Sequence, residues 1–405
     1  MTPKIKTGDH VLALTVFALM VFGLVMIVSA SAIISYANFG ESDYYFWHQI
    51  TSVVVSLVVW VIVQQIDYHV WQKAATPLII IAIISLIAVF IPGIGNDYGT
   101  SKSWIDIGPL PSIQPAEFAK LALVIYLSAF FTKKGERTNR LMDGFVPFIL
   151  VVGLMCGLLA LQPDFGITLI VVVTAASIYF VAGANLWHIF LGAVMMFLGV
   201  IVVIENKAYV LKRFVAFINP DIDPQGIGYH IRQSLIAVGS GGLFGQGFGN
   251  SRQKYEYLPE AQGDSIFAIT AEELGLIRII PIIIAFLIIA LRGFRIAENA
   301  KDKFGKLLAT GITTLIVFQA FMNIGVVLSM LPTTGVPLPF ISYGGSSLLS
   351  SVIGIAILLN ISTQIHETTP GRRRIWWPHY THHPRAQRVQ TRRRTSVFFR
   401  KRRVR

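Results

Sequence analysis

Two kinds of residue in this chain could do chemistry at the edge of a membrane: carboxylates beside long apolar runs, and cations among glycines. Asp264 ends the polar stretch LPEAQGD, immediately before an apolar run over residues 265–291. A carboxylate there could act as a general base at the membrane surface. It could equally be the N-cap of the following helix, a role that needs only a polar side chain. For Asp164 in QPDFG, the cap is the favoured interpretation.

Ionisable residues also lie inside apolar runs, where they are costly and mark a pathway, a pair or a site. Glu117 and Lys120 are three residues apart and share one helix face. They form either a structural ion pair or a site in which Lys120 faces a cavity and binds an anion. Glu272 and Glu273 need partners, for which Arg278 or Lys120 would serve. Together these residues predict a polar cavity that opens to the outside.

The elements that position these residues are predicted to be membrane-spanning helices. Apolar residues make up 54% of the chain and charged residues 14%, whereas soluble domains carry roughly a quarter charged residues. Runs of about 20 apolar residues are long enough to cross a bilayer, and they lack the alternation of barrel strands. The sequence therefore predicts an all-α polytopic membrane protein of about ten helices, with a single transmembrane domain over 1–364. The ten runs are 11–36, 47–66, 75–92, 114–132, 145–162, 165–182, 187–204, 265–291, 307–330 and 346–364.

The basic residues predict the orientation. The chain has 34 Lys and Arg against 21 Asp and Glu, but residues 365–405 alone hold 13 basic residues and one acid. With the N-terminus inside, the inner segments hold 25 Lys and Arg and the outer loops seven. Because cytoplasmic loops carry the excess of Lys and Arg, both termini are predicted to be cytoplasmic.

The longest loop, 205–264, joins the seventh and eighth runs and is predicted to be extracytoplasmic. Loops of this length are usually functional or disordered. The segments YHIRQSLIAVG and GSGGLFGQGFGNS favour order, and the glycines would permit close backbone approach to phosphates or sugars, or form a flexible loop. Loops 93–113 and 331–345 face the same side, so the outer face is where we expect the chemistry.

Other classes of site are absent from the sequence. No Walker A pattern, zinc signature or nucleophile elbow occurs. Cys156 is the only cysteine, so the chain can form no internal disulfide and no cysteine-based metal site.

Four segments in fixed order resemble the SEDS family, whose members include FtsW, RodA and SpoVE. They are SWIDIGPLPSIQPAEFAKLALVIYL, QPDFG, the stretch from GYHIRQSLIAVGSGG to AITAEELG, and PLPFISYGGSSLL. The resemblance covers roughly residues 10–365, and SASAI with PFISYGGSSLL is more similar to the FtsW division branch than to RodA.

The resemblance implies a peptidoglycan glycosyltransferase of the bacterial cytoplasmic membrane that polymerises lipid II on the outer side. It implies a class B penicillin-binding protein and other divisome proteins as partners, with undecaprenyl pyrophosphate as the leaving product. The family's essential acid corresponds to Asp264. This carboxylate would act as base, orient the acceptor hydroxyl, or hold a divalent cation (Mg or Mn) against the pyrophosphate. The residues implied to bind substrate are Glu117, Lys120, Trp104, Arg213, Arg232, Gln233, Ser342 and Ser346; the further loop cations Lys212, Arg252 and Lys254 are available for the pyrophosphate.

The chain departs from the family pattern at a few positions. Gln262 and Gly263 replace a histidine–threonine pair that many relatives have before the aspartate, so a histidine at that position cannot be required here. Ala116 removes a hydroxyl from QPSEF, and Arg278 stands where glycine is common after EELG. Two other functions stay open: a lipid II flippase, and a non-catalytic scaffold that activates a penicillin-binding protein.

The basic tail, 365–405, lies outside the resemblance. It has too few aliphatic residues to bury a core, so we expect it to be disordered in isolation. Its arginines and interspersed aromatic residues predict an anchor that binds anionic lipid at the cytoplasmic surface; a nucleic-acid contact is disfavoured.

Overall fold

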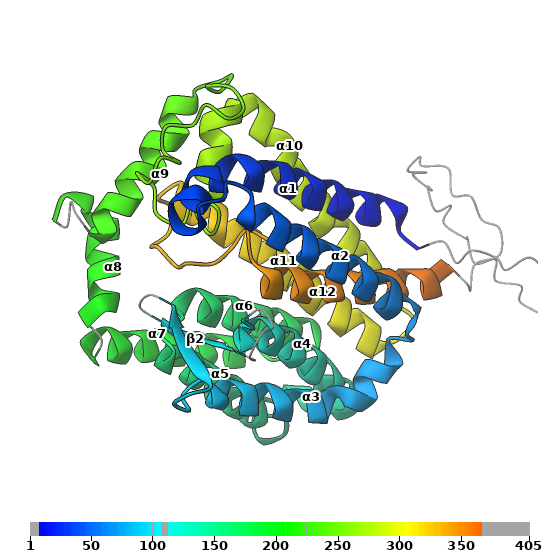
Figure 1. The fold of residues 1–405 in the computed structure, drawn as a ribbon. Helices are drawn as coiled ribbons and strands as arrows, with labels where there is room; N and C mark the ends of the chain where they lie inside the picture. The colour runs from blue at the N-terminus through cyan, green and yellow to red at the C-terminus, as the bar shows by residue number, and fades with distance from the viewer. Residues whose placement is uncertain (1–7, 99–100, 107–111, 207, 223–225, 367–405) are drawn as a thin grey trace, which may run out of the picture. The chain divides into compact units, whose positions relative to one another are not determined.

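The computed structural model describes residues 8–98, 101–106, 112–206, 208–222 and 226–366. Nearly all of the basic tail therefore lies outside the described residues, and its disorder and lipid binding stay predictions. The described chain is a bundle of long helices (Figure 1). In chain order they are α1 (His10–Phe39), α2 (Tyr44–Gln65), α3 (His69–Ala88), α4 (Pro115–Lys134), α5 (Val146–Leu161), α6 (Phe165–Val181), α7 (Leu186–Asn206), α8 (Ala208–Ile218), α9 (Ile227–Gly241), α10 (Ile266–Asn299), α11 (Lys303–Val327) and α12 (Gly345–His366).

The predicted membrane-spanning runs are confirmed as helices. Eight helices of the described residues are long and apolar enough to cross a membrane, and two shorter apolar helices, Phe165–Val181 and Leu186–Val202, complete the ten runs. The chain is thus an all-α polytopic membrane protein, as the composition predicted.

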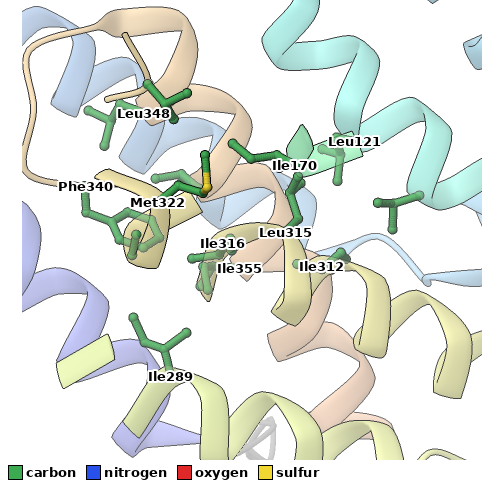
Figure 2. Close-up of a cluster of buried hydrophobic side chains, with 14 of the residues drawn as sticks. Leu121, Ile170, Ile289, Ile312, Leu315, Ile316, Met322, Phe340, Leu348 and Ile355 are labelled. Carbon is green, nitrogen blue, oxygen red and sulfur yellow. The ribbon is translucent and has the colours of Figure 1, made fainter. Parts of the chain in front are cut away.

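The core of the bundle lies where α4, α11 and α12 meet, and these three spans are the most deeply buried. Figure 2 shows some of the buried apolar side chains that gather there: Leu121 of α4, Ile312 and Leu315 of α11, and Ile355 of α12. Peripheral helices instead expose aliphatic side chains such as Leu14. In a bilayer those side chains face lipid, so the burial pattern separates interior helices from lipid-facing ones.

A short β-hairpin interrupts the helical architecture in the predicted outer loop 93–113. Strands β1 (Gly95–Tyr98) and β2 (Ser101–Ile105) pair antiparallel, with Asn96 opposite Trp104. The Ser103 hydroxyl on β2 donates to the carbonyl of Gln162 (3.5 Å), next to the QPDFG turn. Sequence reasoning missed this hairpin because its strands are too short to show a period.

The described part of the long predicted outer loop contains two helices that hydropathy did not reveal. α8 and α9, joined through a 3₁₀ turn (Pro220–Ile222), occupy one side of the bundle between α7 and α10 (Figure 1). Both are too short and too mixed in polarity to be detected as spans.

α10 is broken near its start, and the glycine-rich loop fills the break. Gly275 has φ 75° and ψ 172°, which are non-helical. The freed N–H groups of Leu276 and Ile277 donate to the carbonyls of Gly242 (2.9 Å) and Leu243 (3.1 Å). In return, the carbonyls of Glu272 and Glu273 accept from the N–H groups of residues 246 and 247, at 2.9 and 3.0 Å. The broken helix therefore keeps its backbone hydrogen-bonded through the loop, as a membrane-embedded segment must.

Only glycines allow this approach. A Cβ on Gly275 would lie 2.2 Å from the Gly245 nitrogen, and a Cβ on Gly245 would lie 2.2 Å from the Glu273 oxygen. Both residues also have positive φ, which other residues adopt at a cost. These two glycines thus allow the close backbone packing between the glycine loop and α10; phosphate contact by the other glycines of the cluster stays a prediction.

We expect Gly275→Ala to lower the free energy of unfolding by at least about 2 kcal/mol, from backbone strain plus steric overlap. Thermal unfolding in detergent, followed by tryptophan fluorescence, measures the loss. Gly153→Ala is the control, since a Cβ at this helical position of α5 has no neighbour within 4 Å. Equal melting temperatures for the two variants would contradict the backbone-packing role of Gly275.

Candidate functional site

Asp264 lies in a tight turn at the head of α10 and is not the helix cap. The N-cap position is Ser265, which makes no side-chain capping bond. The turn is closed by Gly263 N–H and Ser265 N–H, which both donate to the carbonyl of Glu260 (2.9 and 3.2 Å). The capping interpretation of Asp264 is therefore wrong, and its carboxylate is available for another role.

The segment 331–345, α11 and α8 lie near this turn. From α11, the Asn323 side chain donates both to the carbonyl of Asp264 (2.7 Å) and to that of Val336 (2.8 Å). A Cβ at Gly335 would lie 4.0 Å from Asp264 Oδ2, so the segment 331–345 lies beside the carboxylate. From α8, Arg213 donates to the carbonyl of Thr333 (3.2 Å) in the same segment.

The electrostatics of this turn favour a proton acceptor. Burial raises the pKa of Asp264 to about 6, against the opposing effects of a hydrogen bond from Ser265 and the charge of Arg213. At neutral pH most of the carboxyl groups are still ionised. A general base is most effective when its pKa lies near the working pH, so Asp264 is suited to take a proton from a hydroxyl.

Asp164 is a second carboxylate outside the spans, at the head of α6. Its Oδ1 accepts from the Ile167 N–H (3.0 Å), which is the predicted N-cap bond. Burial raises its pKa to about 6, while the capping bond and the charge of Lys120 favour ionisation.

Glu117 and Lys120 form a buried ion pair in α4. Lys120 Nζ donates to Glu117 Oε1 (2.9 Å) and to Gln319 Oε1 of α11 (2.8 Å), and both charged side chains are 1% exposed. Gln319 in turn donates to the carbonyl of Pro337 (3.0 Å). The structure therefore shows the structural pair, which braces the segment beside Asp264; anion binding by Lys120 stays a prediction.

The partners predicted for Glu272 and Glu273 were wrong. Glu272 accepts from the Ser251 hydroxyl and from the N–H of residue 252 (3.1 Å). Glu273 accepts from Ser29 of α1 (2.6 Å) and Lys254 (3.2 Å). Both carboxylates thus secure the loop that fills the break in α10.

Two cations consequently have roles that the sequence did not reveal. Lys254 is 7% exposed and paired with Glu273, so it is not available for a pyrophosphate. Arg278 donates to the carbonyl of Phe244 (3.2 Å) in the glycine loop. Arg278 therefore holds this loop and pairs with neither inward glutamate.

The other predicted substrate residues are dispersed. Arg232 lies on the exposed face of α9 and pairs with Asp221, while Gln233 beside it is half-buried. Trp104 lies on β2, half-buried. The contacts described above do not link these three residues to Asp264.

The two predicted serines bond the backbone. Ser342 Oγ accepts from the Leu338 N–H (2.8 Å), and Ser346 Oγ accepts from the Gln114 N–H (3.1 Å). These bonds fix the segment before α12 to itself and to the start of α4. Substrate binding by either serine stays a prediction.

The described residues contain no cluster of side chains that could by themselves form a metal site. Among them, no group of three or more His, Cys, Asp or Glu side chains is arranged to hold a metal ion. The Mg or Mn ion that Asp264 would hold against a pyrophosphate stays a prediction from the resemblance.

Sequence reasoning missed three residues of the site: His230, Ser265 and Asn323. His230 Nε2 lies 2.9 Å from Ser265 Oγ, next to Asp264. A polar residue inside an apolar run was a usable signal for Asn323, whereas nothing in the local sequence around His230 points to Asp264.

Comparison of the sequence with known protein families shows the family to which the chain belongs. The family model described as cell cycle protein, which covers FtsW, RodA and SpoVE, matches residues 9–367. The chain belongs to this family. It is 43% identical over 359 residues to a probable peptidoglycan glycosyltransferase FtsW of Trichlorobacter lovleyi, covering 89% of this chain and 94% of that one. It is 40% identical to the stage V sporulation protein E of Bacillus subtilis, covering 89% and 99%.

Solved structures of similar proteins have the same fold. A chain from the structure described as "Structural coordination of polymerization and crosslinking by a peptidoglycan synthase complex" matches with TM-score 0.72 and 25% identity, covering 88% of this chain and 98% of that one. The rod shape determining protein RodA of Thermus thermophilus matches with TM-score 0.66 and 24% identity, covering 89% and 98%. The helical arrangement is thus shared across the family.

We expect Lys254→Met to reduce the free energy of unfolding by about 3–5 kcal/mol, because Glu273 would keep a buried charge without its cation. Adding Glu273→Gln should recover much of this loss, since the amide is neutral. Thermal unfolding in detergent measures both variants. Lys301→Met, at an exposed lysine, is the control and should change stability by less than about 0.5 kcal/mol. Losses that simply add in the double variant would contradict the pairing.

Proposed function

We propose that this membrane protein is a peptidoglycan glycosyltransferase of the FtsW type that polymerises lipid II, with Asp264 as its general base. Its FtsW relatives are named probable peptidoglycan glycosyltransferases. The observation that carries the residue assignment is the position of Asp264: a carboxylate of raised pKa, outside the capping role, where the predicted outer segments 205–264 and 331–345 meet beside α11.

The reaction transfers a glycosyl group between two lipid-linked disaccharide-peptides. A sugar hydroxyl of the acceptor attacks the anomeric carbon of the donor, and the bond from that carbon to the pyrophosphate oxygen breaks. Asp264 takes the hydroxyl proton, and the polyprenyl pyrophosphate leaves with the bonding electrons. Arg213, whose charge acts on Asp264, would supply positive charge for the leaving anion.

The membrane substrate needs a lateral entrance. An apolar groove of about 450 Å³ lies between α1 and α2, lined by Val21, Leu24, Val25, Val28, Phe46, Ile50 and Phe248. Such a groove suits an enzyme that takes substrate sideways from the bilayer. Asp264 lies in a predicted outer loop, and most Lys and Arg lie in the inner segments on the opposite side. This asymmetry supports an extracytoplasmic site with both termini in the cytoplasm.

A class B penicillin-binding protein is the proposed partner within the division machinery. The matched synthase complex coordinates polymerisation with crosslinking, and crosslinking requires a second activity that this site does not supply. The deciding experiment assays the purified chain with this partner on lipid II in detergent and reads chain length on a gel. In lipid vesicles, movement of lipid II between leaflets without polymer would instead establish a flippase.

Asp264→Asn should abolish polymer formation while expression and partner binding persist, because the amide is nearly isosteric but cannot accept the proton. Glu256→Gln, an exposed acid of the same loop, should keep the wild-type rate. A normal rate for Asp264→Asn would remove Asp264 as the base. It would also favour the scaffold function if polymer then depended on a different enzyme.

The rate should rise with pH through about 6. A base acts in its ionised form, and burial raises the pKa of Asp264 to about 6, so the active fraction increases between pH 5 and 7. The raised pKa means that the folded state binds this proton more tightly than the unfolded state. Ionisation above pH 4 therefore lowers stability, and Asp264→Asn should melt at a higher temperature than the wild type at pH 7. Initial rates and melting temperatures across pH 5–8 test both signs; a flat rate profile below pH 7 would contradict the assignment.

A further inference from the structure

A chain of hydrogen bonds runs from α9 to the proposed base. His230 Nε2 lies 2.9 Å from Ser265 Oγ. Ser265 Oγ lies 3.3 Å from Asp264 Oδ1 and 3.0 Å from the carbonyl oxygen of Pro259. Ser265 is fully buried, with 0% of its surface exposed. A hydroxyl so enclosed has its orientation set by these three neighbours.

The chemistry of the neighbours fixes the direction of the chain. An ionised Asp264 carboxylate and the Pro259 carbonyl can only accept a hydrogen bond, and Ser265 has a single proton to give. If the Ser265 hydroxyl donated its proton to His230, Asp264 Oδ1 and the Pro259 carbonyl oxygen would both lie beside Ser265 Oγ with no proton between them. The arrangement is satisfied when His230 carries its proton on Nε2 and donates to Ser265, which then donates toward Asp264 and Pro259.

The charged groups around His230 are consistent with this direction. Burial lowers its pKa, and Arg213 on α8 lowers it further, while Glu260 of the turn opposes them. The imidazole is therefore neutral near pH 7 and has one proton, which the geometry puts on Nε2.

We propose that His230 is a positioning residue that acts through Ser265 to fix the side-chain orientation of Asp264. Ser265 holds Oδ1, so the proton from the acceptor hydroxyl goes to Oδ2, on the side of Gly335. The inference rests on the proposed role of Asp264. It adds that α9, within the long loop, sets the geometry of the base.

Paired substitutions separate positioning from simple packing. His230→Leu removes the donor but keeps apolar bulk, whereas His230→Gln retains an N–H donor at similar reach. Ser265→Ala cuts the chain one bond closer to the base, and Ser265→Thr retains the hydroxyl. Ser240→Ala is the control, because this serine of α9 donates only to the carbonyl of Ala237.

The assay uses the full chain with its penicillin-binding partner, with lipid II varied to obtain kcat and KM, and melting temperatures recorded for every variant. His230→Leu and Ser265→Ala should each lower kcat about tenfold, the effect of losing one hydrogen bond in the transition state, with KM within about twofold. His230→Gln and Ser265→Thr should recover most of the rate. The double variant His230→Leu with Ser265→Ala should be no slower than Ser265→Ala alone, because both remove the same chain.

Three results would overturn the proposal: multiplied losses in the double variant, His230→Gln as slow as His230→Leu, or a raised KM with unchanged kcat. If His230→Leu does not fold, Ser265→Ala with its threonine rescue decides alone. The base assignment is tested separately. An inactive Asp264→Asn beside wild-type rates for His230→Leu and Ser265→Ala would refute the positioning inference alone, whereas an active Asp264→Asn would refute the assignment of Asp264 as base.

Discussion

The break in α10 is the constraint on which the rest of this structure depends. A spanning helix can be interrupted only where other protein groups satisfy its freed backbone. Here the loop of residues 242–247 supplies those groups on both sides of Gly275. The carboxylates of Glu272 and Glu273 then tie the following residues, 251–254, to α10 and to α1. One short region of backbone pairing and ion pairing thus fixes the first turns of α10.

The contacts that hold the start of α10 also determine the position of Asp264. Asp264 lies two residues before α10 begins, so its position follows from how the start of α10 is held. Asn323 of α11 fixes the backbone of the turn, and His230 of α9 reaches the neighbouring serine. The proposed base, Asp264, is thus held by three helices, α9, α10 and α11, as a preorganised site requires.

The ionisable residues fall into two groups with different physics. Lys120 with Glu117, and Lys254 with Glu273, are buried pairs that satisfy each other's charge and connect helices. Asp264 lacks such a cationic partner at hydrogen-bond distance among the described contacts, and burial raises its pKa. A carboxylate in an ion pair has its charge compensated by its partner and is a poor proton acceptor. A carboxylate whose pKa is raised toward neutral pH is a better one.

The sequence by itself determined the spans and the class of fold, and it made Asp264 the candidate base. Each of these depends on local length, composition or motif, which a linear chain displays directly. Only the tertiary structure decided which charges meet. Lys254 contacts Ser29 of α1, and His230 reaches Ser265 across a long loop. Side chains far apart in sequence carry no periodic signal of their contact, so Arg278, Lys254 and the inward glutamates were given the wrong partners. The capping alternative for Asp264 likewise depended on the direction of one side chain, which packing of the turn against α9 and α11 decides.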